Sequence, residues 1–231
     1  YTPSRHGAAV VLAHGAVADR AQLAGELRIL QRAGFGVLAF DWPGRGESGG
    51  RVTYGPSERD ALRAAVSYVA ARPDVDPSRI GALGFSIGAA LVACEAERDD
   101  RLRALVLVAP FADSDEQTKL EFARWGPLTA WPAVWVDHAL MPDGPLRPVD
   151  AVRDLAGRSL LIVEGTEDHV VPPWMSDEVY VAARAAKKER LVVPGASHMT
   201  YEAYLDGAFG RRVAQFFEDS LARPPSSSRS P

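Results

Sequence analysis

The stretch Gly84-Phe85-Ser86-Ile87-Gly88 decides the fold. It follows the apolar run 80–85 and precedes residues 87–96, where small and apolar side chains dominate. In this context G-x-S-x-G is informative, because a serine on a tight strand-to-helix turn projects its hydroxyl away from the sheet and the glycines relieve crowding. The N-terminus of the following helix stabilises negative charge that develops nearby. The motif predicts a nucleophilic Ser86; the alternative is an ordinary glycine-rich turn.

The rest of the chain alternates short apolar runs with helical stretches. Each run is nearly continuously apolar, which suits a parallel sheet covered on both faces. The expected strands are residues 8–13, 36–40, 80–85, 104–109, 160–164 and 190–193. Helices are expected along the stripes Leu23, Leu27, Leu30 and Leu62, Val66, Val69, and over residues 87–96, 174–186 and 208–221. This alternation predicts right-handed crossovers and an α/β fold with a doubly wound, mostly parallel sheet of about six strands.

Residues 111–158 interrupt that alternation. The segment contains Trp125, Trp131 and Trp135 and several prolines. Because so long a connection is usually functional, we expect a short helical cap or pocket wall. Its tryptophans are predicted to pack as hydrophobic residues or, compatibly, to line a cleft that favours an apolar acyl or aryl group. We expect one domain over residues 1–222 and a disordered tail, rich in Pro and Ser, over residues 223–231.

Composition excludes several classes of protein. The 231 residues are 47% hydrophobic and carry a formal net charge of −4, which gives no electrostatic reason to expect a nucleic-acid partner. The single cysteine, Cys94, rules out an internal disulfide framework and a multi-cysteine zinc site, and we interpret it as a small core residue. No H-E-x-x-H or similar spacing supports a metal, so we predict neither metal nor cofactor.

The sequence constrains cellular location weakly. No apolar run reaches the roughly 18 residues that span a bilayer. The chain starts at Tyr1 rather than Met, which leaves room for a signal peptide or a membrane anchor before residue 1. We expect a cytoplasmic protein, with secretion or anchoring left open.

A serine nucleophile requires a base and an acid that orients it. Of the five histidines, His198 is the best candidate, because Gly195-Ala196-Ser197-His198 follows the last strand directly. His14 suggests a backbone role beside Gly15, while His6, His138 and His169 read as terminal, cap and loop residues. Asp168, past the turn after strand 160–164, is the preferred acid, with Glu164 and Glu167 as alternatives; a solvated acidic loop is the competing interpretation.

An oxyanion hole needs two positioned N–H donors. The first candidate is the backbone N–H of Ile87, the residue after the serine. The second is the backbone N–H of Ala16, with Val17 as the alternative, in the loop after the first strand. Gly15 would let that loop approach the substrate oxygen.

Five segments together resemble the α/β-hydrolase superfamily of serine hydrolases, in the compact-cap subgroup called serine aminopeptidase-like or Bem46-like. They are His14-Gly15, 41–48 (Asp-Trp-Pro-Gly-Arg-Gly-Glu-Ser), 84–88, 165–172 and 195–198. The order Ser…Asp…His is also the order of that superfamily. The resemblance implies a Ser86–His198–Asp168 triad acting on ester, thioester or amide substrates. The chain departs from the family in two places: it lacks room for a further antiparallel hairpin before the first strand, and it has Asp41-Trp42-Pro43-Gly44 where the subgroup tends to have Asp-Tyr-Arg-Gly.

A competing motif is Gly44-Arg45-Gly46-Glu47-Ser48-Gly49, which satisfies G-x-G-x-x-G. A dinucleotide loop opens directly into a helix, whereas Gly50, Thr53, Gly55 and Pro56 delay the helix here. We therefore predict a tight turn beside the active site.

These observations predict a serine hydrolase with a small-molecule ester or related acyl substrate. The favoured activity is a carboxylesterase that cleaves small to medium acyl esters through an acyl-enzyme. A peptidase, thioesterase or acyltransferase on the same triad remains an alternative, as does a catalytically silent binding protein on a hydrolase scaffold.

Overall fold

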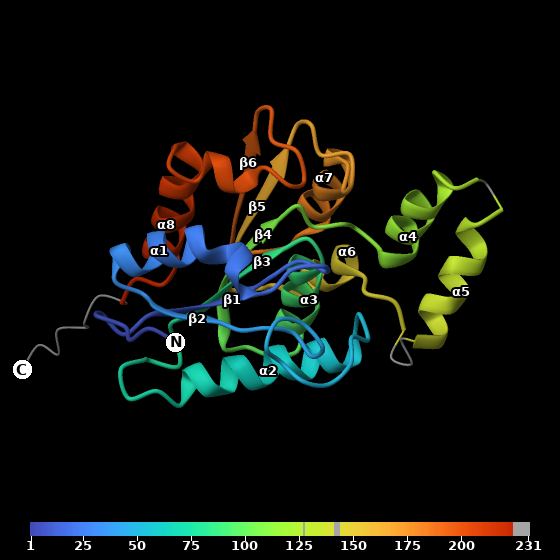
Figure 1. The fold of residues 1–231 in the computed structure, drawn as a ribbon. Coiled ribbons are helices and arrows are strands. Elements are labelled where there is room, and N and C mark those ends of the chain that lie inside the picture. The colour runs from blue at the N-terminus through green and yellow to red at the C-terminus, as the bar shows by residue number, and fades with distance from the viewer. Residues whose placement is uncertain (127, 141–143, 224–231) are drawn as a thin grey trace, which may run out of the picture.

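The computed structural model describes residues 1–126, 128–140 and 144–223 (Figure 1). Its centre is a six-stranded sheet in the order β2-β1-β3-β4-β5-β6, in which every neighbouring pair is parallel. The strands are β1 (Ala9–Ala13), β2 (Gly36–Ala39), β3 (Ile80–Phe85), β4 (Leu102–Val108), β5 (Ser159–Gly165) and β6 (Lys187–Val193). The predicted fold class is confirmed.

Helices cover both faces of the sheet, which is why its central strands are apolar throughout. Helices α1 (Ala24–Ala33) and α8 (Ala208–Ser220) pack on one face (Figure 1). Helices α2 (Pro56–Ala70) and α3 (Ile87–Ala96) pack on the other. Every residue of β1 and β3 is buried, so these two strands supply the middle of the core.

The strand order creates a switch point at the centre of the sheet. Strand β1 pairs with β2 on one side and with β3 on the other. The chain therefore continues from the carboxyl ends of β1 and β3 onto opposite faces of the sheet. Ligands of open α/β sheets bind in the crevice that such a divergence forms. The loop after β1 and the serine turn after β3 both lie at this point.

Several element ends differ from the predicted ones by one or two residues, and two differ by three or more. Helix α7 (Pro173–Ala182) ends before residue 186, because Ala183 adopts extended backbone with ψ 132° and β6 starts at Lys187. Strand β6 starts three residues earlier than predicted. Its first residues are charged and exposed, as suits the edge of a sheet, and this hid the strand from an apolar pattern.

The N-terminal segment makes an antiparallel contact with β2, the outer strand on the side of the sheet opposite β6. Thr2 N–H donates to the Val37 carbonyl at 2.9 Å, and Val37 N–H donates to the Thr2 carbonyl at 3.0 Å. The predicted tail 223–231 falls, except for Arg223, outside the described residues.

Within residues 111–158, helices α4 (Ser114–Ala123) and α5 (Ala130–Leu140) form a hairpin that projects from the carboxyl edge of the sheet (Figure 1). The chain then returns to the body through α6 (Pro148–Ala151) and η2 (Val152–Asp154), in which Pro148, Ala151 and Val152 are buried. The cap and domain boundaries stay a prediction.

The prediction that the cap tryptophans are packed is wrong. Trp125, Trp131 and Trp135 are 73%, 60% and 71% exposed, whereas Val134, between the last two on α5, is buried. Over the parts of the chain that are described, no helix is both long and apolar enough to span a bilayer.

Candidate active site

Ser86 occupies the turn between β3 and α3 in a strained backbone conformation. Its φ is 56° and its ψ is −120°, a combination that a residue with a Cβ seldom adopts. Its N–H donates to the Val108 carbonyl of β4 at 2.9 Å, and its own carbonyl accepts from Ala89 and Ala90 in α3. The turn is thus held from the neighbouring strand and from the helix, and the strain is a property of the folded site.

A hydrogen-bond chain runs from Ser86 to His198 and on to Asp168. The Ser86 Oγ lies 3.1 Å from His198 Nε2, and His198 Nδ1 lies 2.8 Å from Asp168 Oδ2. Because a carboxylate only accepts, Nδ1 carries the proton and Nε2 is left to accept the serine proton. The three predicted triad residues are brought together, and each stands just after the carboxyl end of a different strand. Their catalytic role stays a proposal.

Asp168 is buried and its two oxygens are fully engaged. Oδ1 accepts from the backbone N–H groups of Val170 at 3.0 Å and Val171 at 2.9 Å. Oδ2 accepts from the Tyr201 hydroxyl at 3.3 Å as well as from His198. Burial and the neighbouring Asp168 charge raise the pKa of Tyr201, so this hydroxyl remains a donor at any working pH. These contacts fix the carboxylate and, through it, the imidazole ring.

Sequence reasoning missed two aromatic residues at this site. Tyr201 lies three residues beyond His198, on the 3-10 turn Tyr201–Tyr204, and carries no motif that marks it. Phe85, the residue before the serine, packs against the His198 ring with 4.8 Å between ring centroids. Both residues help to hold His198 in place. Their role becomes visible only in the structure, where the loop after β6 lies close to the end of β3.

The alternative acids are placed elsewhere. Glu164 is buried and its Oε1 accepts from Arg190 Nε at 3.1 Å and Nη2 at 2.6 Å, so it pairs β5 with β6. Glu167 is exposed. Asp168 is therefore the acid among the three candidates whose carboxylate contacts His198.

The loop after β1 lies against the first turn of α3. A Cβ on Gly88 would come within 2.1 Å of the Ala13 carbonyl oxygen and 2.6 Å of the His14 carbonyl oxygen, so only glycine allows this approach. Gly15 N–H donates to Gln22 Oε1 at 2.8 Å, which ties the same loop to the turn before α1. Ala16 is half-buried at this position, whereas the alternative donor residue, Val17, is 83% exposed.

His14 has the backbone role that the sequence suggested. It is fully buried, its Nε2 accepts from Trp42 N–H at 3.1 Å, and its Nδ1 donates to the Gly15 carbonyl at 2.8 Å. The Trp42 indole N–H in turn donates a hydrogen bond to the His14 carbonyl at 2.9 Å. Burial lowers the pKa of His14, consistent with a neutral ring that accepts at one nitrogen. The residue locks the loop after β1 to the loop after β2.

The glycine-rich loop 41–50 forms a tight turn beside the site. Gly44 N–H donates to the Gly49 carbonyl at 3.0 Å, and Gly44 and Gly46 have φ values of 73° and 50°. The buried Asp41 accepts from the Arg20 guanidinium and from the Glu47 N–H. Burial alone would raise the pKa of Asp41, but these hydrogen bonds and the Arg20 charge lower it. The loop does not open into a helix, which agrees with a turn rather than a dinucleotide site.

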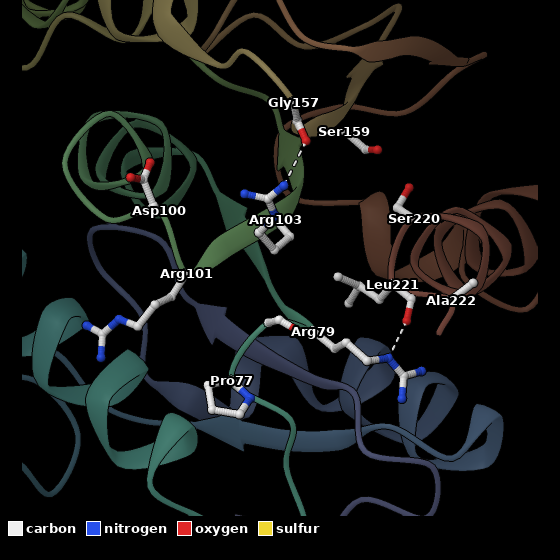
Figure 2. A pocket seen from close by; sticks show the side chains of 11 residues that line it. Pro77, Arg79, Asp100, Arg101, Arg103, Gly157, Ser159, Ser220, Leu221 and Ala222 are labelled. Atoms are coloured by element: carbon white, nitrogen blue, oxygen red, sulfur yellow. Dashed lines mark hydrogen bonds between the residues drawn. The ribbon is translucent and has the colours of Figure 1, made fainter. Parts of the chain in front are cut away.

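A separate hollow lies at the opposite edge of the sheet, where the strands begin (Figure 2). Three arginines line it, but Arg79 Nε donates to the Leu221 carbonyl at 2.7 Å and Arg103 donates to the Gly157 carbonyl at 3.2 Å. Arg101 is engaged by the Asp99 carboxylate. These contacts are structural, and none of the triad residues lines this hollow.

The fold and the site together define the class: the protein is a serine hydrolase of the α/β-hydrolase type. The chain belongs to the prolyl oligopeptidase family, whose family model matches residues 21–223. It is 33% identical over 208 residues to the uncharacterised protein Rv2307c of Mycobacterium tuberculosis, covering 90% of this chain and 68% of that protein. It is 27% identical over 197 residues to the uncharacterised protein YfhR of Escherichia coli, covering 83% and 63%.

Solved structures share the fold. The esterase Pf2001 of Pyrococcus furiosus superposes with a TM-score of 0.77 at 23% identity, over 94% of this chain and 84% of that one. Acetyl xylan esterase 1 of Thermoanaerobacterium superposes with a TM-score of 0.72 at 20% identity, over 96% and 78%. At these identities the likeness establishes the architecture, and the substrate has to be argued from the site.

Proposed function

We propose that the protein is a carboxylesterase that cleaves small to medium acyl esters through a Ser86–His198–Asp168 triad. The observation that carries the proposal is the continuous hydrogen-bond chain, 3.1 Å from Ser86 Oγ to His198 Nε2 and 2.8 Å from His198 Nδ1 to Asp168 Oδ2. Both distances lie within ordinary hydrogen-bond reach, as a nucleophile and its base require.

In the proposed reaction Ser86 Oγ attacks the ester carbonyl while its proton passes to His198 Nε2. Asp168 stabilises the imidazolium that forms. The proton then passes from Nε2 to the departing alkoxide, which leaves an acyl-enzyme on Ser86. A water molecule then attacks the acyl carbonyl carbon while His198 Nε2 takes its proton. Collapse of this second tetrahedral intermediate breaks the bond to Ser86 Oγ, which recovers the proton from Nε2, and the carboxylic acid is released.

The proposed oxyanion hole consists of the backbone N–H groups of Ile87 and Ala16. Ile87 opens α3, and the first N–H groups of a helix have no partner within the helix. The close approach of Ala13 and His14 to Gly88 supports placing the Ala16 loop beside them. Such donors are each worth about 10²–10³ in rate in acyl-transfer enzymes.

Two further observations bear on the choice of substrate. The two structural neighbours described above are esterases, which favours ester cleavage. The family name favours a peptidase as the second candidate, because the same triad would cleave an amide. The pocket and not the triad selects between these leaving groups.

The test is covalent labelling with a fluorophosphonate probe, followed by a substrate panel. We expect the wild-type chain to be labelled and the Ser86→Ala and His198→Ala variants to lose both labelling and hydrolysis, by about 10³-fold or more. Ser159→Ala, at the opposite edge of the sheet, is the matched control and should be labelled like the wild type.

The panel consists of p-nitrophenyl esters of graded chain length, acyl-CoA and aminoacyl amides. Turnover of the esters alone supports a carboxylesterase, whereas preferential cleavage of the amides would establish the peptidase instead. A wild-type chain that neither reacts with the probe nor turns over any substrate would overturn the proposal and leave a binding protein on a hydrolase scaffold.

A further inference from the structure

The hairpin of α4, α5 and the connection between them carries a group of large exposed apolar side chains, which we call the hairpin tip. Its members are 41% to 88% exposed, and they are Leu120, Phe122, Trp125, Leu128, Trp131, Trp135 and Val136. Soluble proteins rarely gather so many large apolar side chains on one exposed feature without a binding partner. Trp131 and Trp135 lie one turn apart on α5, so they share one side of that helix.

The hairpin is a built element with its own internal contacts. The Thr118 hydroxyl donates to Asp137 Oδ2 at 2.5 Å, and His138 Nε2 lies 2.9 Å from Asp115 Oδ1. Its base is tied to the proposed site, because Gln117 Nε2 donates to the Val170 carbonyl at 2.9 Å, two residues after Asp168. Ser86 directly follows the carboxyl end of β3, and the hairpin projects from that edge of the sheet (Figure 1).

Charges are sorted along the hairpin. From residue 118 to residue 136 the charged residues are Lys119, Glu121 and Arg124, a net positive charge. The Lys119 Nζ lies 4.5 Å from the centre of the Trp131 ring, and the Arg124 guanidinium carbon lies 5.9 Å from the centre of the Trp125 ring. The other carboxylates of the hairpin stand at its base and are Asp115, Glu116 and Asp137. Cationic side chains therefore lie beside two of the indole rings, and most carboxylates of the hairpin lie at its base.

We propose that the hairpin tip docks on the surface of an anionic lipid bilayer. Tryptophans settle at the membrane–water interface because an indole has an apolar body and a polar N–H, and long cationic side chains lie over apolar surface while their heads reach the phosphates. A narrow projecting tip with this composition suits insertion among headgroups, whereas a protein partner would have to supply a concave site around it. Docking would turn the Ser86 edge of the sheet toward the lipid.

The proposal is tested by co-sedimentation with vesicles of phosphatidylcholine alone and of an equal mixture of phosphatidylcholine and phosphatidylglycerol. We expect the wild-type chain to bind the mixed vesicles, and the combined variant Trp125→Ala/Trp131→Ala/Trp135→Ala to bind them at least about tenfold more weakly. Lys119→Ala/Arg124→Ala should weaken binding to the mixed vesicles by up to about tenfold and remove the preference for them. Tyr68→Ala, which removes an exposed aromatic ring from α2, is the matched control and should bind normally.

Two further measurements keep the outcomes distinct. Circular dichroism and thermal unfolding must show that the triple variant is folded, and brominated lipids should quench the fluorescence of the wild-type tip. Ser86→Ala should bind vesicles like the wild type, so a failure of the esterase proposal leaves this one intact. Absence of wild-type binding to either vesicle, equal binding by the folded triple variant, or a dimer in solution that the triple variant abolishes would each overturn it; the last would assign the tip to a second copy of the chain.

Discussion

Two imidazoles at strand ends of this molecule are held by different partners. His14 sits between a backbone donor and a backbone acceptor, with a Trp42 N–H at Nε2 and the Gly15 carbonyl at Nδ1. His198 has a carboxylate at Nδ1 and a serine hydroxyl at Nε2. An imidazole between two backbone groups is bound as a neutral ring, whereas one beside a carboxylate can carry a proton during a reaction. Residue type alone does not separate these roles; the neighbours do.

Protonation of His14 should therefore destabilise the fold. Burial lowers its folded-state pKa below the unfolded value of 6.5, so the unfolded chain binds the additional proton and the free energy of unfolding falls as the pH drops below 6.5. We expect His14→Gln to lose this part of the pH dependence. The free energy of unfolding is measured with urea at neutral pH and at a pH about one unit below the unfolded pKa of histidine. The exposed His6→Gln is the control. Identical pH dependence in His14→Gln and the wild type would contradict the argument.

The junction of β3 and α3 depends on glycines that leave no room for a side chain. A Cβ on Gly84 would lie 2.3 Å from the Gly88 carbonyl oxygen, and a Cβ on Gly88 would meet the end of β1. The serine turn, the first turn of α3 and the loop after β1 are thus packed backbone against backbone. This packing brings the proposed nucleophile and the proposed oxyanion donors into one place.

Gly84→Ala should disrupt this junction. Because the new methyl group meets backbone rather than a flexible side chain, the junction has to open, and we expect a loss of about 1–3 kcal/mol in the free energy of unfolding together with weaker fluorophosphonate labelling. Gly49→Ala is the matched control, since a Cβ there has nothing within 4 Å. Both quantities follow from urea denaturation and probe labelling. A Gly84→Ala chain as stable and as reactive as the Gly49→Ala chain would show that the junction is not tight.

Across the whole molecule, the two ends of the parallel strands have different roles. The triad residues and the loop after β1 follow the carboxyl ends of the strands, and the hairpin projects from the same edge of the sheet (Figure 1). At the opposite edge the buried Arg79 donates to the Leu221 carbonyl (Figure 2). It also donates to the His6 carbonyl, so one side chain ties the N-terminal segment to the end of α8. Stability at that edge and chemistry at the other should be separable by mutation.

Arg79→Ala should lower stability and leave the site intact. The buried Leu221 carbonyl and the partly buried His6 carbonyl lose their donor, which costs about 1–3 kcal/mol in the free energy of unfolding. Arg103→Ala removes a half-buried arginine of the same hollow whose hydrogen bond to Gly157 is exposed, and it should change stability by less than about 0.5 kcal/mol. Chemical denaturation measures both variants, and fluorophosphonate labelling at low temperature should match the wild type. Loss of labelling in folded Arg79→Ala would mean that the two edges are coupled.

Much of the site follows from local sequence. The alternation of apolar runs with helical stripes determined the α/β class, and the glycine-flanked serine marked its own turn, because the geometry of a strand-to-helix turn is written in adjacent residues. The order of the three residue types along the chain limited the candidate partners of Ser86 to His198 and the short acidic loop that contains Asp168. These features depend on neighbours along the chain, which a sequence displays directly.

Only the tertiary structure decided which acid reaches the imidazole, which side chains support it and which remain exposed. Asp168 contacts His198 while Glu164, four residues earlier, turns to Arg190 on β6. The Ser86–His198 bond joins residues 112 positions apart, and Tyr201 meets Asp168 across 33. The tryptophans of the hairpin have the composition of a core yet face outward. Such contacts depend on how strands and loops are packed in space, and packing free energy is shared among residues that no local pattern connects.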